Sequence, residues 1–237
     1  MRIIYLNEKS INYSTFWNRL LKTSKLMHYT CLGFLLFGLS NSAISQDTIS
    51  IGVNSVGNGT SSYPCPIQDY YEGGRNQYLY RASELSAAGM TPGYITQASF
   101  FALSANSSGT FPAVEGFEFK IGTTTSNTLV AGAWNAGPLT SVYGPANYSV
   151  TAGANLIPFT TSFYWNGCDN IIIETCNGDA ANTTATYYTN NSSFAWTTGL
   201  GFNSSRTYRS DNQGSLCGYT GTTENGTTTT RPNITFY

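Results

Sequence analysis

The stretch that most constrains the fold is residues 163–176, which joins two apolar runs by a turn and carries two cysteines. Asn166-Gly167 is a dipeptide that accepts positive φ, so the aromatic run Phe163-Tyr-Trp predicts the end of one strand and Ile171-Ile-Ile the start of the next. Three consecutive isoleucines leave no polar face, which favours a strand covered on both sides. We therefore expect this to be a central strand of a β structure.

The two cysteines of this stretch limit how the chain can be cross-linked. Cys168 and Cys176 are eight positions apart, and an extended strand rises about 3.3 Å per residue, which separates them by roughly 25 Å. A disulfide requires Cα atoms within about 7 Å. Each cysteine must therefore pair elsewhere, and the other cysteines outside the N-terminal leader are Cys65 and Cys217. Two arrangements remain open at this point: Cys176 with Cys217 and Cys65 with Cys168, or the crossed pairing.

Residues 1–45 read as a leader for export. The first 26 residues carry five of the eleven basic residues of the chain, and the apolar run at residues 31–39 is shorter than the roughly 20 residues that span a bilayer. Small residues at Ala43 and Ser45 predict cleavage before Gln46. Met27 is an alternative start, although the basic residues would then be lost, and a short buried helix is the alternative interpretation of the apolar run.

The remaining chain, residues 46–237, has the length of one domain and very little charge. It holds six basic residues against eleven carboxylates, a formal net charge of −5, so it has no basic patch to neutralise phosphates and nucleic acid is excluded as a partner. Abundant Ser, Thr, Asn and Gly with 14% aromatic residues predict an all-β extracellular or cell-surface domain rather than low-complexity disorder. Four cysteines in an exported chain favour disulfides. We expect no membrane span in the mature chain.

The clearest prediction of a single strand comes from a segment in which apolar and charged residues alternate. Phe117, Phe119 and Ile121 alternate with Glu118 and Lys120, which predicts one buried and one outward face. Further strands are expected at residues 49–53, 95–103, 155–159, 185–189, 194–197, 206–209 and 233–237. Long loops are expected at residues 123–155 and 177–184, and one short connector helix at residues 83–89, with Ser83 as N-cap and Gly89 as its stop. The pattern predicts an all-β, two-sheet antiparallel sandwich with a jelly-roll-like topology.

Several short segments spread over residues 49–237 form a recognisable set: Gln77-Tyr-Leu-Tyr80, Ala82-Ser-Glu-Leu85, Phe117-Glu-Phe-Lys-Ile-Gly122, Phe163-Tyr-Trp-Asn-Gly167, Asn170-Ile-Ile-Ile-Glu174 and Arg231-Pro-Asn-Ile234. Together they resemble the N-terminal β-sandwich module of large secreted surface proteins of Bacteroidetes, which are adhesin-like and associated with type IX secretion. The resemblance implies an exported binding module without catalytic residues.

The same resemblance also implies a disulfide pairing. In that family one cysteine follows the buried strand and another precedes the Arg-Pro-Asn strand, which implies that Cys176 pairs with Cys217 and leaves Cys65 with Cys168. Such modules are followed by Ig-like repeats and a sorting domain, and neither follows Tyr237 here. We expect either a piece of a longer multidomain protein or a lone module.

Enzymes are the rival class. The only histidine, His28, lies in the leader, so the mature chain cannot build a Ser-His-Asp or Cys-His site or a His-ligated zinc. Paired carboxylates can still hydrolyse a glycosidic bond, and the candidates by residue type are Glu84, Glu115, Glu118 and Glu174. Because no spacing pairs them, we predict that the protein is not an enzyme and needs no cofactor.

A structural Ca²⁺ is the one metal for which the chain offers suitable oxygens. The candidate ligands lie in loops at either end of the central strand and beside the last cysteine: Asp169, Asn177, Asp179 and Asp211. The regular spacing of a dedicated calcium loop is absent, so ordinary turn chemistry is the favoured interpretation.

Exposed aromatic residues are the favoured ligand-contacting groups. Six of them lie in segments read as loops or short edges: Tyr70, Tyr71, Trp134, Tyr143, Tyr148 and Trp196. Flat rings can stack on sugars or anchor a protein partner, and the alternative is that they plug the ends of the sandwich. The prediction is a non-catalytic secreted or cell-surface binding module. The alternatives are a carbohydrate-binding accessory domain of a secreted hydrolase, or a structural spacer in a surface filament.

Overall fold

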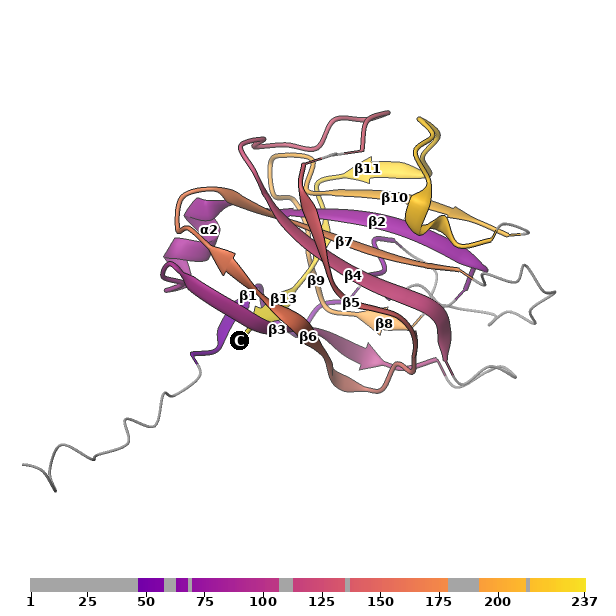
Figure 1. Ribbon diagram of the computed structural model, residues 1–237, viewed down its shortest axis with the longest axis horizontal. Helices are drawn as coiled ribbons and strands as arrows, with labels where there is room; N and C mark the ends of the chain where they lie inside the picture. Colours follow the sequence, from indigo (N-terminus) through magenta and orange to yellow (C-terminus); the bar gives the residue numbers. More distant parts are fainter. Residues whose placement is uncertain are drawn as a thin grey trace, which may run out of the picture. The chain divides into compact units, whose positions relative to one another are not determined.

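The triple isoleucine lies in β7 (Asn170–Gly178), an interior strand of the larger of two sheets in the computed structural model (Figure 1). The structure describes residues 47–57, 63–67, 70–106, 113–134, 137–178, 192–211 and 214–237. The larger sheet has the order β11-β10-β2-β7-β4-β5. Its other strands are β11 (Gly226–Thr228), β10 (Ser205–Ser210), β2 (Gly73–Tyr80), β4 (Val114–Thr124) and β5 (Leu139–Tyr148). The prediction of a central strand is confirmed.

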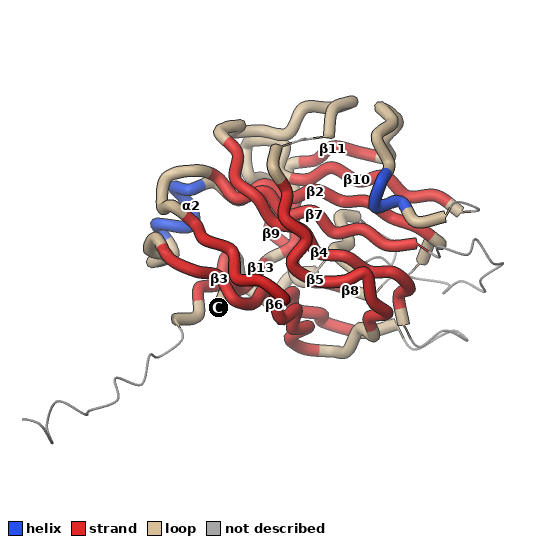
Figure 2. The backbone as a smooth tube through the Cα atoms, in the orientation of Figure 1, coloured by secondary structure: helices blue, strands red, loops and turns tan. Residues whose placement is uncertain are grey.

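The smaller sheet lies against the inner face of the larger one, and the two layers are seen in Figure 2. It has the order β1-β13-β3-β6, with β8 also paired to β3. Its strands are β1 (Ile49–Ile51), β13 (Ile234–Phe236), β3 (Gly93–Ser104), β6 (Gly153–Trp165) and β8 (Ser193–Phe194). A short pair, β9 (Trp196–Thr197) with β12 (Arg231–Pro232), lies outside both sheets. The predicted all-β antiparallel sandwich is confirmed.

The core forms between the inner faces of the two sheets. Alternate residues of each strand enter it, as period-two geometry requires. The largest fully buried apolar side chains are Trp165, Tyr78, Tyr80, Phe100, Phe117, Phe119, Phe194 and Phe236. Ile171 and Ile173 point into this core, whereas Ile172 points the other way, into a second cluster with Leu79, Leu129 and Phe202. β7 is therefore covered on both faces, as its sequence predicts.

Two strand predictions are wrong. Residues 123–155, expected to be a loop, contain β5, an edge strand whose pattern is weak because Val142 is its one fully buried residue. The segments expected separately at residues 155–159 and 163–165 are parts of one long strand, β6. The turn after β6 is as predicted, since Gly167 has a φ of +81° and a Cβ there would lie 2.5 Å from Pro92 Cγ.

The connector helix is α2 (Ala82–Ala87). Its N-cap is Arg81 rather than Ser83, which lies inside the helix. The Arg81 backbone N–H donates to Glu84 Oε2 at 2.9 Å, so a carboxylate in the first turn satisfies it. Gly89 follows the helix with a φ of +92°, in agreement with its predicted role as a stop.

One of the two favoured disulfides is present. Cys176 in β7 bonds to Cys217 in a 3₁₀ turn, η1 (Leu216–Gly218), with Cα atoms 5.0 Å apart. The pairing of Cys65 with Cys168 is wrong, since no disulfide joins them. Cys65 is buried in the sandwich, where its Sγ donates to the Ile67 carbonyl at 3.3 Å, whereas Cys168 is exposed in the turn before β7.

Three predicted features lie outside the described residues: the expected leader at residues 1–45, the expected strand at residues 185–189 and Asp179. No helix in the described part of the chain has the length and apolar character to cross a membrane.

Candidate functional site

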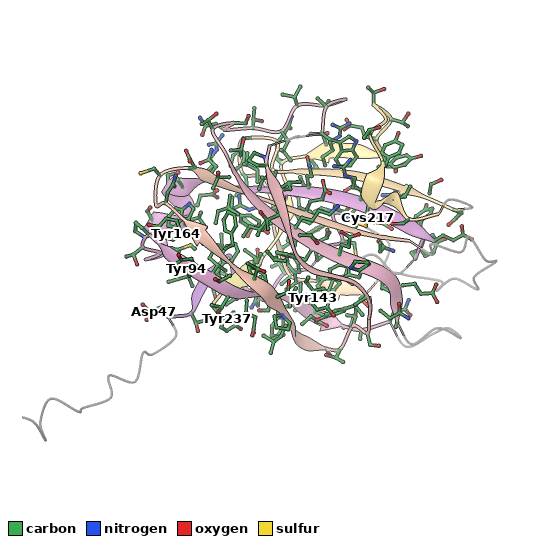
Figure 3. The ribbon with its side chains drawn as sticks, viewed as in Figure 1. Asp47, Tyr94, Tyr143, Tyr164, Cys217 and Tyr237 are labelled. Atoms are coloured by element: carbon green, nitrogen blue, oxygen red, sulfur yellow. A yellow bond between two sulfur atoms is a disulfide. The ribbon has the colours of Figure 1, made fainter. Side chains whose placement is uncertain are left out.

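Two tyrosines form an exposed pair on the solvent face of the smaller sheet. Tyr94 of β3 and Tyr164 of β6 are direct cross-strand partners, with ring centroids 5.2 Å apart in an edge-to-face arrangement. They are 69% and 54% exposed, among the most exposed large side chains of the described residues. Their neighbours Ile95 and Trp165 are buried, so strand alternation turns both tyrosines outward. In Figure 3 the two tyrosines are neighbours, with Tyr164 labelled just above Tyr94.

The strands of the sheet that carries this pair have no charged side chain and several hydroxyl groups. None of the residues of β1, β13, β3 and β6 is acidic or basic. Thr96 donates to the Tyr237 carbonyl at 3.2 Å, and the hydroxyls of Ser99 and Tyr237 lie 3.4 Å apart. Tyr94, Tyr164, Thr96, Tyr237 and the exposed Leu156 are called the tyrosine face below. It offers flat rings and hydroxyls to an uncharged ligand.

Trp134, a predicted ligand-contacting residue, instead covers the outer face of the larger sheet. Its Nε1 donates to the Gly221 carbonyl at 3.0 Å. The guanidinium carbons of Arg75 and Arg206 lie 4.4 and 4.3 Å from the centre of its ring. The indole is half-buried and makes packing and cation–π contacts, and its predicted contact with a ligand stays a prediction.

Tyr143, Tyr148 and Trp196 are also half-buried. The ring centroids of Tyr143 and Tyr148 lie 6.0 and 5.3 Å from that of Phe117, which places them at one edge of the core. The Tyr148 hydroxyl donates to the Leu156 carbonyl at 3.0 Å, and burial, with a smaller effect of Tyr143, raises the pKa of that phenol. The alternative interpretation, that these rings plug the sandwich, fits them better.

Tyr70 and Tyr71 belong to a second aromatic group, just before the first residue of β2. Their ring centroids lie 4.8 Å apart, and Tyr63 lies 6.4 Å from Tyr71. The Arg209 guanidinium carbon is 3.8 Å from the centre of the Tyr63 ring, a cation–π contact. Tyr70 is 38% exposed, so it is the one predicted aromatic residue that the structure leaves well exposed to solvent within the described residues.

Three of the four carboxylates considered for glycoside hydrolysis, Glu84, Glu118 and Glu174, form ion pairs, whereas Glu115 forms none within the described residues. Glu174 is 1% exposed and accepts hydrogen bonds from Arg75 Nε at 2.9 Å and Gln77 Nε2 at 2.9 Å. Lys120 Nζ lies 3.3 Å from Glu174 and 3.6 Å from Glu118. The expected outward face of Glu118 and Lys120 is in fact partly covered, because Lys120 also donates to the Cys217 carbonyl of η1 at 3.2 Å.

Among the predicted calcium ligands, Asp179 lies outside the described residues, and Asp169 lies apart from the other described candidates. Asp169 lies just before β7 and Asn177 near its other end, so they are separated by most of the strand. The Asp169 carboxylate accepts from Asn166 Nδ2 at 2.7 Å, and Asp211 Oδ1 accepts from the Glu72 backbone N–H at 3.3 Å. These are turn and strand-end contacts.

A cluster of Glu118 with Cys176 and Cys217 also brings possible metal-ligating atoms close together, but the two sulfurs are joined in the disulfide. They are therefore not thiolate ligands.

Sequence reasoning missed the tyrosine face. It treated Phe163-Tyr-Trp as one apolar run and took residues 95–103 as the strand that contains Ile95, which left Tyr94 outside it. Strand alternation could have identified Tyr164: if the side chain of Trp165 points into the core, that of Tyr164 must point to solvent. The register that sets Tyr94 opposite Tyr164 is a tertiary feature.

No family model and no curated protein matches this chain. Among solved structures, the chain is similar to the cysteine protease and lectin-like domains of Cwp84, a surface layer associated protein of Clostridium difficile. The identity is 13% and the TM-score 0.36, and the match covers 74% of this chain and 36% of that one. The chain thus matches little more than a third of that chain's length, and so distant a likeness carries no argument about function.

Proposed function

We propose that residues 46–237 form a non-catalytic, exported surface-binding module whose ligand is a neutral glycan held on the tyrosine face. The observation that carries the proposal is the cross-strand pair of Tyr94 and Tyr164, 69% and 54% exposed on a sheet without charged residues. Sugar rings present flat C–H faces to aromatic rings and hydroxyls to polar groups. Thr96, two residues along β3 from Tyr94 and exposed like it, supplies a hydroxyl partner beside the pair.

Three further features support this proposal. The Cys176–Cys217 disulfide suits an oxidising, extracellular compartment. The chain beyond the leader has no histidine for acid–base catalysis, and Glu174 and Glu84, both considered for catalysis, are held by arginines. We also propose that the chain is related to the adhesin-like modules of Bacteroidetes that its sequence resembles. A carbohydrate-binding accessory domain of a hydrolase would use the same face. A hydrolase domain encoded in the same gene would favour that alternative over an adhesin-like module.

The test is glycan-array binding by purified residues 46–237, oxidised and folded, with and without calcium. We expect binding to one glycan class in both conditions. Replacing Tyr94 or Tyr164 with Ala should weaken binding about tenfold, because a sugar covering roughly 50 Å² of ring contributes about 1.3 kcal/mol.

Two control variants sharpen this experiment. Tyr164→Phe keeps the ring and should retain most of the binding. Tyr70→Ala removes an exposed ring from the second aromatic group and should leave binding unchanged. Loss of binding in Tyr70→Ala alone would move the site to that group. A blank array from folded protein would favour a spacer or a protein-binding module, with Tyr94 and Tyr164 serving only as a cross-strand pair.

A further inference from the structure

Three polar residues form a row across the inner face of the larger sheet. The strand register sets Thr207 of β10 opposite Asn76 of β2, and Asn76 opposite Thr175 of β7. The next residue in this row is Phe119 of β4. Because Tyr78, Ile173 and Phe119 belong to the core, period two places the three polar side chains on the core-facing side.

The row is buried, and its side-chain oxygens have no partner in the part of the chain that the structure describes. Asn76 is 1%, Thr175 1% and Thr207 3% exposed. Within the described residues, Asn76 Oδ1 and the hydroxyls of Thr175 and Thr207 have no hydrogen-bond partner. Leaving one such group unpaired is costly, and nearly all buried polar groups in proteins have a partner in protein or ordered water. Three unpaired buried oxygens on adjacent strands call for one common explanation.

Tyr78 adds a donor beside the row. Its phenol is fully buried and also has no hydrogen-bond partner among the described residues. A side-chain hydrogen bond from Thr175 lowers the pKa of Tyr78 less than burial raises it, but the contact falls short of full hydrogen-bond geometry, so both hydroxyls retain capacity for another partner. Burial, with the neighbouring Cys65 thiol, raises that pKa well above its usual value, so the phenol keeps its proton and can donate.

We propose that ordered water molecules occupy the interior beside this row, bound by Asn76, Thr175, Thr207 and Tyr78. A buried water typically makes about three hydrogen bonds. Here the Asn76 carbonyl can accept from water, the Tyr78 phenol can donate to it, and the threonine hydroxyls can do either. The set contains no charged group, so it suits water better than an ion.

The first test is a crystal structure at a resolution that shows ordered solvent. The expected result is water within about 3.2 Å of Asn76 Oδ1 and of at least one threonine hydroxyl. Direct pairing of Asn76 Oδ1 with a protein donor, without water at the row, would overturn the proposal.

Two variants of one residue test which group holds the water. Thr207→Val keeps the shape and removes the hydroxyl, whereas Thr207→Ser keeps the hydroxyl. Slow-exchanging internal water, measured by ¹⁷O relaxation dispersion, should decrease in the Val variant and be retained in the Ser variant, with Thr230→Val as a control. The Thr230 hydroxyl already donates to Thr198 at 2.8 Å. An equal signal of slow-exchanging water in all variants would contradict water binding by Thr207. If Thr207→Val does not fold, the crystal structure of the unchanged chain decides whether water is bound at the row.

Discussion

Arg231 and Glu84 lie 147 positions apart in the chain and form a two-pronged ion pair in the structure. Arg231 Nη1 donates to Glu84 Oε2 at 2.9 Å, and Nη2 donates to Oε1 at 2.6 Å. Arg231 also donates to the Leu79 carbonyl, and its guanidinium carbon lies 4.3 Å from the centre of the Tyr80 ring. One arginine near the end of the chain therefore ties β12 to α2 and β2.

Arg231→Met should strongly destabilise the protein. The substitution keeps a long side chain but leaves Glu84 without its cation and the Leu79 carbonyl without its donor, and we expect a loss of about 3 kcal/mol in chemical denaturation. Arg81→Met is the matched control. Its guanidinium donates to the Asn127 carbonyl at an exposed position, so it should cost about 1 kcal/mol or less. Equal losses in both variants would contradict a special role for Arg231.

The stability should fall in acid partly through Glu84. Desolvation alone would raise the pKa of this carboxyl, but the hydrogen bonds and charge of Arg231 outweigh it, and the pKa is lowered. A lowered pKa contributes stability that is present above the unfolded value of about 4.3 and is lost as pH falls through the folded value.

Melting temperatures between pH 7 and pH 3 would measure this contribution. Glu84→Gln should be less stable than the unchanged protein at pH 7 and should lose less on acidification below about pH 4.3. Glu115→Gln removes a carboxylate that forms no ion pair within the described residues, and its profile should follow the unchanged protein. Parallel profiles for Glu84→Gln and the unchanged protein would exclude a role of Glu84 in acid stability.

The Cys176–Cys217 disulfide should contribute substantially to stability. It closes a loop with a sequence separation of 41, and the chain-entropy model gives about 4 kcal/mol for a loop of this size. The double variant Cys176→Ala, Cys217→Ala should show this loss in denaturant titration. Cys168→Ala, at an exposed free thiol, should cost little. A double variant as stable as the parent would show that the turn η1 stays in place without the bond.

Thiol labelling distinguishes Cys65 from Cys168, the two described cysteines outside the disulfide. In native residues 46–237, one thiol should react quickly, because Cys168 is exposed and Cys65 is buried. Two thiols should react after denaturation without reductant. Detection of no thiol in denaturant would instead show that Cys65 and Cys168 are bonded after all.

Trp134 and Tyr94 should respond differently to replacement by Ala. Trp134→Ala removes a half-buried indole that contacts Arg75 and Arg206, and we expect a loss of about 2 kcal/mol in stability. Tyr94→Ala removes an exposed ring and should cost less than about 1 kcal/mol. The midpoint of urea unfolding measures both. If Trp134→Ala leaves stability unchanged, its ring is free for a ligand, as the sequence-based interpretation assumed.

Some features of the fold could be predicted because their cause is local. The alternation of Phe117, Phe119 and Ile121 fixes which face of β4 is buried, whatever lies opposite. The triple isoleucine likewise indicates a strand covered on both faces. In contrast, β2 contains Arg75, Asn76 and Gln77, yet every residue of the strand is buried. Its outer face is covered by segments far along the chain, such as Tyr219, whose carbonyl accepts a hydrogen bond from Arg75, and no local pattern reports such a cover.

The sequence by itself therefore determined the properties that depend on composition and periodicity: low charge, a β architecture, a central apolar strand and no histidine in residues 46–237. These follow from residue types and their spacing, which act over a few positions. Only the tertiary structure decided that Cys65 and Cys168 stay apart, that Trp134 is packed against arginines, and that Tyr94 and Tyr164 meet at the surface. Such relationships depend on strand register and on which distant segments cover a face, and these are set by the packing of the whole chain.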